Sequence, residues 1–524
     1  MLFVALLVLH LLPIWVLPFF PTEDGPGHQA VANILRHYDE PGGQVLREYY
    51  DINERSLTNW FIFAILSHGL GFLPVPLAEK VLLSGYVLLL PLSVRYALRA
   101  IRPENGFLAA LAFPFTYNYL FQMGFFNFCC SLAALFLAFG WWWRRQDRFG
   151  PARTAVFAVL VLWVYFCHPV SLVMLLAAVG TVTGWRLLLE GFHRRFAGPL
   201  LAFVPALALV VYYMSAHQGA KTSALPLWVK VKHLLALYSL VALDFRIVAL
   251  SAVLALLFGV VSFWLLVRRV RQGRLSPADG LLLTVLVFTL AYFLAPNELG
   301  SGGFLTHRLN LYPFLGLLLW FATFDYPERA RGWIYAAAVT IAVGFLSMLA
   351  PRWMALDDYL AEYWAAADRI EPGSTLLSLS FAHSGRAPDG REMAFRTWPF
   401  VHASGYIAAR KTVVDLALYE AMEDYFPIRY RPGLDPYRRI SVGDHLGIED
   451  QPPRVDFLTY PRRTGGRVDY VLLWQLDAVP RDDPRVRSIL RQLAAGYEPV
   501  YTSPRRLVRL YRSTRGASAV PTAR

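Results

Sequence analysis

The sequence has 524 residues, of which 56% are hydrophobic and only 17% are charged, and its mean hydropathy is +0.41. Soluble domains are nearer half apolar and a quarter charged, so this composition excludes an ordinary soluble enzyme, a disordered chain and a disulfide-rich secreted scaffold. The formal net charge of +13 does not indicate nucleic-acid binding, because the basic residues gather in short clusters between apolar runs.

The charged residues divide the chain into two regions. Residues 1–350 contain 41 charged residues, whereas the 174 residues that follow contain 46. The first region has the composition of a membrane domain and the second that of a soluble domain. We therefore predict a transmembrane domain over 1–350, a soluble domain over 351–515 and a disordered tail over 516–524.

Apolar runs long enough to cross about 30 Å of hydrocarbon predict the transmembrane helices. In chain order they lie at 2–20, 76–99, 107–121, 125–143, 154–168, 170–189, 197–214, 244–267, 277–296, 309–324 and 333–350. Two further apolar segments, 59–73 and 224–243, either raise the count from eleven to thirteen or lie flat at the membrane interface. The expected fold class is a polytopic α-helical membrane protein with 11–13 transmembrane helices and a separate soluble domain.

Basic clusters between these runs predict the orientation of the chain. They lie at 95–102, 144–153, 186–195, 268–274 and 329–331, and the positive-inside rule places them in the cytoplasm. The N-terminus is then cytoplasmic, and the polar loop 21–58 and the C-terminal domain are extracytoplasmic. The expected location is the bacterial cytoplasmic (inner) membrane, with the first apolar run kept as a helix rather than cleaved as a signal peptide.

The C-terminal domain reads as α/β or α+β. Helical periodicity occurs at 357–370 and 485–495, and strand-like runs occur at 375–380, 470–474 and 507–511, with a polar middle over 386–467. Several ionisable residues are scattered through this domain and are interpreted as surface or fold-supporting: His383, His402, Asp415, Glu420 and Asp424.

The polar loop 21–58 carries the strongest candidate for chemistry. It contains seven of the sixteen acidic residues of the membrane region, and its segment Pro21–His28 places adjacent carboxylates Glu23 and Asp24 directly after the first helix. The turn at 25–27 brings Asp24 and His28 toward the same space, where a carboxylate suits a general base and the pair suits a divalent metal. Alternatively, Asp24 is an N-cap of the helix expected at 28–38.

This layout resembles the GT-C superfamily of polyprenyl-phosphate-sugar-dependent glycosyltransferases, which includes protein O-mannosyltransferases, aminoarabinose transferases and their bacterial relatives. The resemblance rests on an acidic residue after the first helix, a long outer loop, many apolar helices and an outer C-terminal domain. It implies that Asp24 is the catalytic carboxylate, with Glu23 as the second candidate. The superfamily's second acidic pair has its nearest counterpart in Asp39-Glu40, which lacks the aromatic residue expected soon after it.

The segment Thr306–Phe314 looks like the arginine and proline pattern that opens a late helix in many bacterial members. Arg308 is the only Asp, Glu, Lys or Arg between Glu298 and Asp325, and it follows His307. An arginine offers a planar fork of donors and a permanent charge, which suit the phosphate of a lipid carrier. The alternative is an interfacial arginine that reaches toward lipid headgroups.

Two further groups are weaker candidates for substrate contacts. Lys221 and Lys230 lie in an apolar outer segment, where they would bind donor phosphate or simply attract lipid headgroups. Tyr50, in the first loop, would line the acceptor site or pack the loop onto the membrane.

Together these features predict a glycosyltransferase that moves a sugar from a polyprenyl-phosphate donor to a lipid, glycan or protein acceptor. No cofactor is required by the sequence, apart from a possible divalent metal near Asp24 and His28. The competing functions are a transporter or flippase and a non-catalytic membrane scaffold. A transporter typically carries ionisable residues near the bilayer midplane and internal repeats, and the sequence shows neither pattern.

Overall fold

The computed structural model describes residues 1–54, 58–216, 222–299, 302–443 and 446–514. Lys221 and the predicted tail at 516–524 lie outside the described residues. The chain forms two compact units. The first comprises Met1–Ile14, Arg55–Ile62 and Leu83–Ala350, and the second comprises Trp15–Glu54, Phe63–Leu82 and Pro351–Arg524.

Long apolar helices dominate the first unit. In the part of the chain that the structure describes, six helical segments are long and apolar enough to cross a membrane: Val75–Ile101 (α5), Phe126–Trp143 (α7), Pro169–Glu190 (α9), Arg194–Ser215, Ile247–Gln272 (α13) and Glu328–Arg369. Three shorter apolar helices accompany them: Leu2–Val16 (α1), Pro151–Cys167 (α8) and Asp279–Leu294 (α14). This arrangement confirms the prediction of a polytopic helical membrane protein.

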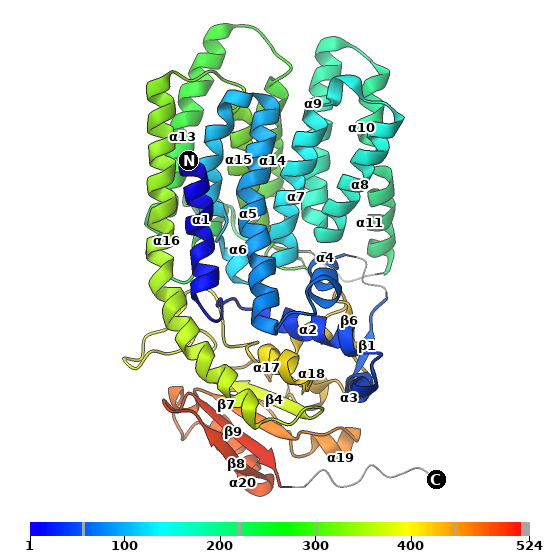
Figure 1. The fold of residues 1–524 in the computed structure, drawn as a ribbon, viewed down its shortest axis with the longest axis vertical. Helices are drawn as coiled ribbons and strands as arrows, with labels where there is room; N and C mark the ends of the chain where they lie inside the picture. The colour runs from blue at the N-terminus through cyan, green and yellow to red at the C-terminus, as the bar shows by residue number, and fades with distance from the viewer. Residues whose placement is uncertain (55–57, 217–221, 300–301, 444–445, 515–524) are drawn as a thin grey trace. The chain divides into compact units, whose positions relative to one another are not determined.

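The helices of the first unit pack in an order that follows from short connections. Helix α7 lies between α8 and α9, α9 packs on α14, and α14 packs on α15 (Leu305–Phe321) (Figure 1). Pro169 starts α9 because a proline at the first helical position loses no hydrogen bond, and Gly191 ends it with a φ of +80°. Large apolar side chains remain exposed on the outer helix faces, such as Val159 and Phe263, as expected of surfaces that meet lipid.

One predicted span and the two ambiguous apolar segments form short helical pieces. The run at 107–121 is a 3₁₀-helix over Pro103–Phe115 followed by the short α6 (Tyr119–Gln122), because Pro114 interrupts α-helical bonding and Asn118 caps α6 by accepting from the Phe121 N–H. Segment 59–73 contains α4 (Phe61–Ala64) and the π-helix Ile65–Gly69, and segment 224–243 contains α12 (Leu227–Leu235) and the 3₁₀-helix Tyr238–Leu240. These pieces are too short to span a bilayer alone.

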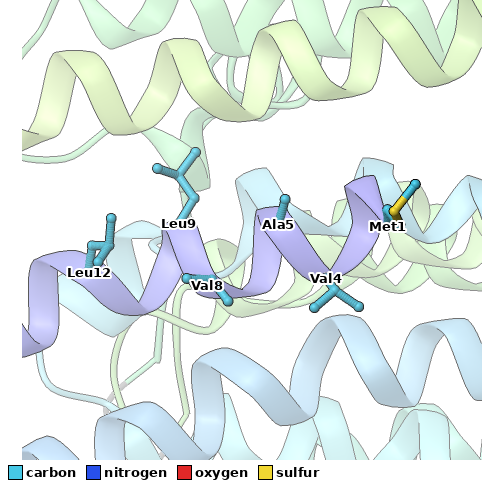
Figure 2. Close-up of a pocket in the computed structure, with 6 residues that line it drawn as sticks. All are labelled: Met1, Val4, Ala5, Val8, Leu9 and Leu12. Atoms are coloured by element: carbon cyan, nitrogen blue, oxygen red, sulfur yellow. The ribbon is translucent and has the colours of Figure 1, made fainter.

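An apolar groove runs along α1. It has a volume of about 650 Å³ and is lined by Met1, Val4, Ala5, Val8, Leu9 and Leu12 (Figure 2). All six side chains are apolar, so the groove suits hydrocarbon and offers no side-chain group for acid–base chemistry. The candidate residues for chemistry therefore lie outside this groove.

The second unit is built around a five-stranded sheet. Its order is β5-β4-β7-β9-β8, with β4 (Thr375–Ser380) parallel to β5 (Val414–Asp415) and β7 (Tyr470–Trp474). The antiparallel strands β9 (Val508–Ser513) and β8 (Tyr497–Thr502) complete it. The predicted strands are thus confirmed, as is the helix expected at 485–495, which is α20 (Pro484–Gly496).

The loop after the first helix belongs to this second unit. It forms α2 (Gly25–His37), α3 (Gln44–Tyr49) and β1 (Tyr50–Ile52), and β1 pairs antiparallel with β6 (Ile428–Tyr430). Helix α2 packs on α17 (Ser404–Lys411) so closely that a Cβ on Gly405 would lie 2.2 Å from the backbone oxygen of Pro26. This close approach fixes the start of α2 against the start of α17.

Candidate functional site

Asp24 occupies the N-cap position of α2, but its carboxylate does not cap the helix. Its backbone oxygen accepts from the N–H of His28 at 2.9 Å, whereas its side chain makes no capping bond. Instead, Oδ2 accepts a hydrogen bond from the hydroxyl of Tyr419 at 2.9 Å. The Asp24 side chain is only 6% exposed, so the structure directs this carboxylate into the interior of the second unit.

Glu23 is also buried, and it is bound differently. Its Oε2 accepts from the backbone N–H of Trp398 at 2.7 Å. Burial and the neighbouring charge of Asp24 raise the pKa of Glu23 well above its usual value. Glu23 is therefore tied to the backbone and is held more firmly in its protonated form than an ordinary glutamate.

Three residues of the C-terminal domain lie at this site: Tyr419, which the sequence pattern does not single out, and Glu420 and His402, which it indicates as surface or fold-supporting residues. Glu420 is fully buried, Tyr419 binds Asp24, and the Nε2 of His402 lies 3.9 Å from the Oδ1 of Asp24. The rings of His402 and Tyr419 are also in contact, tilted by 31° with centroids 4.5 Å apart. Glu420 and His402 are thus not surface residues, because α17 and the 3₁₀-helix Tyr419–Ala421 pack against α2. The alternative of a fold-supporting role stays open for both.

The other scattered residues divide between burial and exposure. His383 and Asp415 are buried, and His383 bonds to Ser380 and to the backbone oxygen of Glu449, which supports the interpretation of a fold-supporting role. Asp424 is exposed, as expected. Glu420 had a signal in the sequence, because it is an isolated charge within the apolar run 416–422.

Burial controls the electrostatics of the site. It raises the pKa of Asp24 to about 8, an effect that the hydrogen bond from Tyr419 opposes and the charge of Glu449 reinforces. Burial lowers the pKa of both His28 and His402 to about 3. The imidazole of His402 is therefore neutral near pH 7, and its contact with Asp24 is not an ion pair.

His28 and Tyr50 both lie in the second unit. His28 contacts aromatic rings, whereas Tyr50 is bound by backbone and by a neighbouring tyrosine. The ring of His28 makes an edge contact with Phe63 at a centroid distance of 5.3 Å. The hydroxyl of Tyr50 donates to the backbone oxygen of Asp415 at 2.9 Å, and its ring stacks on Tyr430. Tyr50 thereby helps to join β1 to β6.

Metal binding at this site has no support from clustering. In the described ranges of the chain, no group of three or more His, Cys, Asp or Glu side chains is arranged to hold a metal ion. The divalent metal near Asp24 and His28 stays a prediction.

Arg308 lies in the first unit, near the start of α15, among aromatic rings. Its guanidinium carbon is 4.8 Å from the ring centroid of Phe125 and 5.7 Å from that of Phe128, and Nη1 donates to the backbone oxygen of Gly303. These contacts hold the guanidinium in one place. The preceding residue, His307, contacts the ring of Tyr119 at a centroid distance of 5.3 Å.

Lys230 is engaged by backbone groups. Its ammonium donates to the oxygens of Phe293 at 2.9 Å and Ala295 at 2.7 Å, and the residue is only 4% exposed. Binding of a phosphate by Lys230 would have to compete with both carbonyls.

Comparison of the sequence with family models and with curated proteins finds no match. Among solved structures, the apo form of ArnT from Cupriavidus metallidurans is similar over 99% of this chain and 98% of its own, with a TM-score of 0.50 and 10% identity. A structure of the same protein bound to undecaprenyl phosphate gives a TM-score of 0.49 and 13% identity over 99% of each chain. The chain has an ArnT-like fold. This confirms the predicted GT-C-like fold, and the chemistry has to be argued from the site.

Proposed function

We propose that the chain is a GT-C-type glycosyltransferase of the cytoplasmic membrane. It transfers a sugar from a polyprenyl-phosphate donor to a lipid, glycan or protein acceptor at the outer face. The ArnT-like fold supports the class of enzyme. The observation that carries the proposal is the buried Asp24, which is bound by Tyr419 and has a pKa raised to about 8.

Asp24 is suited to act as the general base. A carboxylate with a pKa near the working pH takes a proton more readily than an ordinary aspartate, whose conjugate acid is too strong. In the proposed step, Asp24 accepts the proton of an acceptor hydroxyl or amine as its oxygen or nitrogen attacks the anomeric carbon. The bond from that carbon to the phosphate oxygen breaks with inversion, and the polyprenyl phosphate leaves with the bonding electrons. Glu23 is the second candidate, although its carboxylate is already engaged by Trp398.

Arg308 is proposed to hold the donor phosphate and to stabilise the charge that develops on the leaving group. Its position between Phe125 and Phe128 restricts the guanidinium, which lowers the cost of ordering it when an anion binds. His307, His28, Lys221 and Tyr50 remain proposed substrate contacts. Lys230 is not assigned to the donor phosphate, because its ammonium is bound by the backbone oxygens of Phe293 and Ala295.

A transporter or flippase is the competing function, and a non-catalytic scaffold is a further alternative. Ion-coupled transport places ionisable groups within the membrane-spanning segments. Asp24, Glu420 and Glu449 lie outside the six candidate spans, whereas the buried Glu79 lies within one and accepts a hydrogen bond from Tyr406. The gathering of carboxyls outside the spans favours chemistry over ion coupling. A scaffold would not need to keep Asp24 buried at a cost in solvation.

The test is turnover of a radiolabelled polyprenyl-phosphate hexose in membranes that contain the wild-type chain or Asp24→Asn at equal expression. Loss of a positioned general base predicts a decrease of about 10²-fold or more in the variant. Equal turnover in both would remove Asp24 from the mechanism. No turnover by either, with several donors and crude acceptor extracts, would contradict the transferase and favour transport or scaffolding.

A further inference from the structure

Glu420 is the residue whose environment the proposed step leaves unexplained. It is 0% exposed, and among the described residues no other residue donates a hydrogen bond to either of its carboxyl oxygens. No Lys or Arg of that part forms an ion pair with it. A buried carboxyl in this state is costly, and a fold retains such a group where a ligand supplies the missing partners.

Gly27 makes room for the Glu420 carboxyl at the first turn of α2. A Cβ at Gly27 would lie 2.1 Å from Oε1 and 2.8 Å from Oε2 of Glu420. The carboxyl therefore occupies space that an alanine side chain would fill. Since Asp24 directly precedes α2, this contact places Glu420 beside the same helix start as the proposed base.

His402 provides a second unpartnered group at this site. The residue is 8% exposed, its Nε2 faces Asp24 at 3.9 Å, and its Nδ1 has no hydrogen-bond partner among the described residues. Polar atoms from two parts of the C-terminal domain are thus left unsatisfied around one carboxylate. A ligand that carries several hydrogen-bonding groups would satisfy them together.

The protonation of Glu420 indicates what kind of group it binds. Burial raises the pKa of Glu420 well above its usual value, and the charges of Asp24, Asp415 and Glu449 raise it further. A protonated carboxyl both donates and accepts, as a hydroxyl group does. An anion such as phosphate gains little here, because it would face the carboxylates of the site.

We propose that the Glu420 carboxyl binds a hydroxyl group of the acceptor, next to the group that Asp24 deprotonates. This inference rests on the proposed glycosyl transfer and adds a substrate-contacting residue from the C-terminal domain. It also specifies the acceptor as a molecule with at least two neighbouring polar groups.

The test uses the purified full-length protein in liposomes, with a radiolabelled polyprenyl-phosphate hexose and a titrated crude envelope extract that contains lipid, glycan and protein as the acceptor probe. Glu420→Met removes the hydrogen bonds and keeps an unbranched side chain, so the half-saturating amount of extract should rise about tenfold. Glu420→Gln imitates the neutral carboxyl and should stay within about threefold of wild type. The exposed Glu371→Gln is the matched control and should change nothing.

Glycine variants test the same contact from the other side. Gly27→Ala should displace the carboxyl and reproduce the Glu420→Met effect, and the two changes combined should add little to either alone. Gly42→Ala is the control in the same loop, because a Cβ there meets nothing within 4 Å.

Thermal unfolding separates binding from a structural role. Because folding raises the pKa of Glu420, the folded state loses stability as the pH rises from the unfolded value toward the folded one. Glu420→Met should therefore melt no lower than wild type, with an advantage that grows with pH. A variant that melts lower and loses donor and acceptor binding together would overturn the inference, as would an unchanged acceptor half-saturation. No transfer by wild type would instead remove the proposed function, and this inference with it.

Discussion

The site around Asp24 and the region around Arg308 differ in the ionisation of their side chains. At Asp24, carboxyls and histidines are buried, and burial shifts their pKa values toward the neutral forms. At Arg308, a permanent cation is retained and is placed over the faces of Phe125 and Phe128. The acidic site thus exchanges protons near neutral pH, whereas the basic region keeps its charge at any working pH.

This contrast assigns the two halves of the proposed substrate pair. A fixed guanidinium attracts a phosphate, whereas carboxyls shifted toward their neutral forms do not, so we assign the donor phosphate to Arg308 in the proposed function. A hydroxyl or amine that has to lose a proton belongs with Asp24. Substitutions near Arg308 should therefore affect use of the donor, and substitutions near Asp24 should affect proton transfer from the acceptor.

Arg308→Gln should raise the KM for the polyprenyl-phosphate donor by about 10- to 100-fold, because a charge-assisted bond to phosphate contributes about 1.5–3 kcal/mol. The donor KM of Arg308→Lys should lie between those of wild type and Arg308→Gln, because lysine keeps the charge and loses the planar fork of donors. The control is Arg246→Gln, which removes an exposed arginine paired with Asp244 in the same unit. An unchanged donor KM in Arg308→Gln would show that Arg308 does not bind the donor phosphate, which would contradict the comparison of the two regions.

Lys230→Met should lower stability and leave the donor KM unchanged. The substitution strands the oxygens of Phe293 and Ala295, which costs about 1–3 kcal/mol in the free energy of unfolding. Thermal unfolding and donor titration on the same preparation measure both effects. A higher donor KM with unchanged melting would show that Lys230 binds phosphate, as the sequence suggests.

Tyr419→Phe should shift the pH dependence of transfer to more alkaline values. The Tyr419 hydroxyl stabilises ionised Asp24, so its loss raises the pKa of the base further and leaves less of it deprotonated at pH 7. Transfer at pH 7 should decrease by about threefold, with recovery at higher pH. An equal loss at every pH would indicate that Tyr419 positions the site rather than tunes Asp24.

Hydropathy predicted most of the helices and three of the five strands of the C-terminal sheet, because a buried segment is marked by a run of apolar residues. It did not predict β5 and β8. It failed at 107–121, since composition does not distinguish an α-helix from the 3₁₀-helix that Pro103–Phe115 forms. The sequence indicated Asp24 as a candidate site residue, because a carboxylate there directly follows an apolar helix. Its partner Tyr419 was not indicated, because a contact between residues nearly 400 positions apart leaves no local pattern.

Burial also changed the interpretation of individual polar residues. Lys230 looked like a phosphate ligand in an amphipathic segment, but the end of α14 turns two backbone oxygens toward its ammonium. Glu420 looked like a surface charge, although its apolar neighbours on both sides were consistent with burial. In both cases the environment of the side chain depends on distant parts of the chain that the fold brings close.

The most direct test of the account is the pH dependence of single-turnover sugar transfer by purified wild type and Asp24→Asn. The account predicts that the wild-type rate falls about tenfold per pH unit below a pKa near 8 and reaches a plateau above it. The Asn variant should be about 10²-fold slower or more and independent of pH over this range. Coinciding profiles, with equal plateaus and equal slopes, would contradict the role of Asp24 as the base.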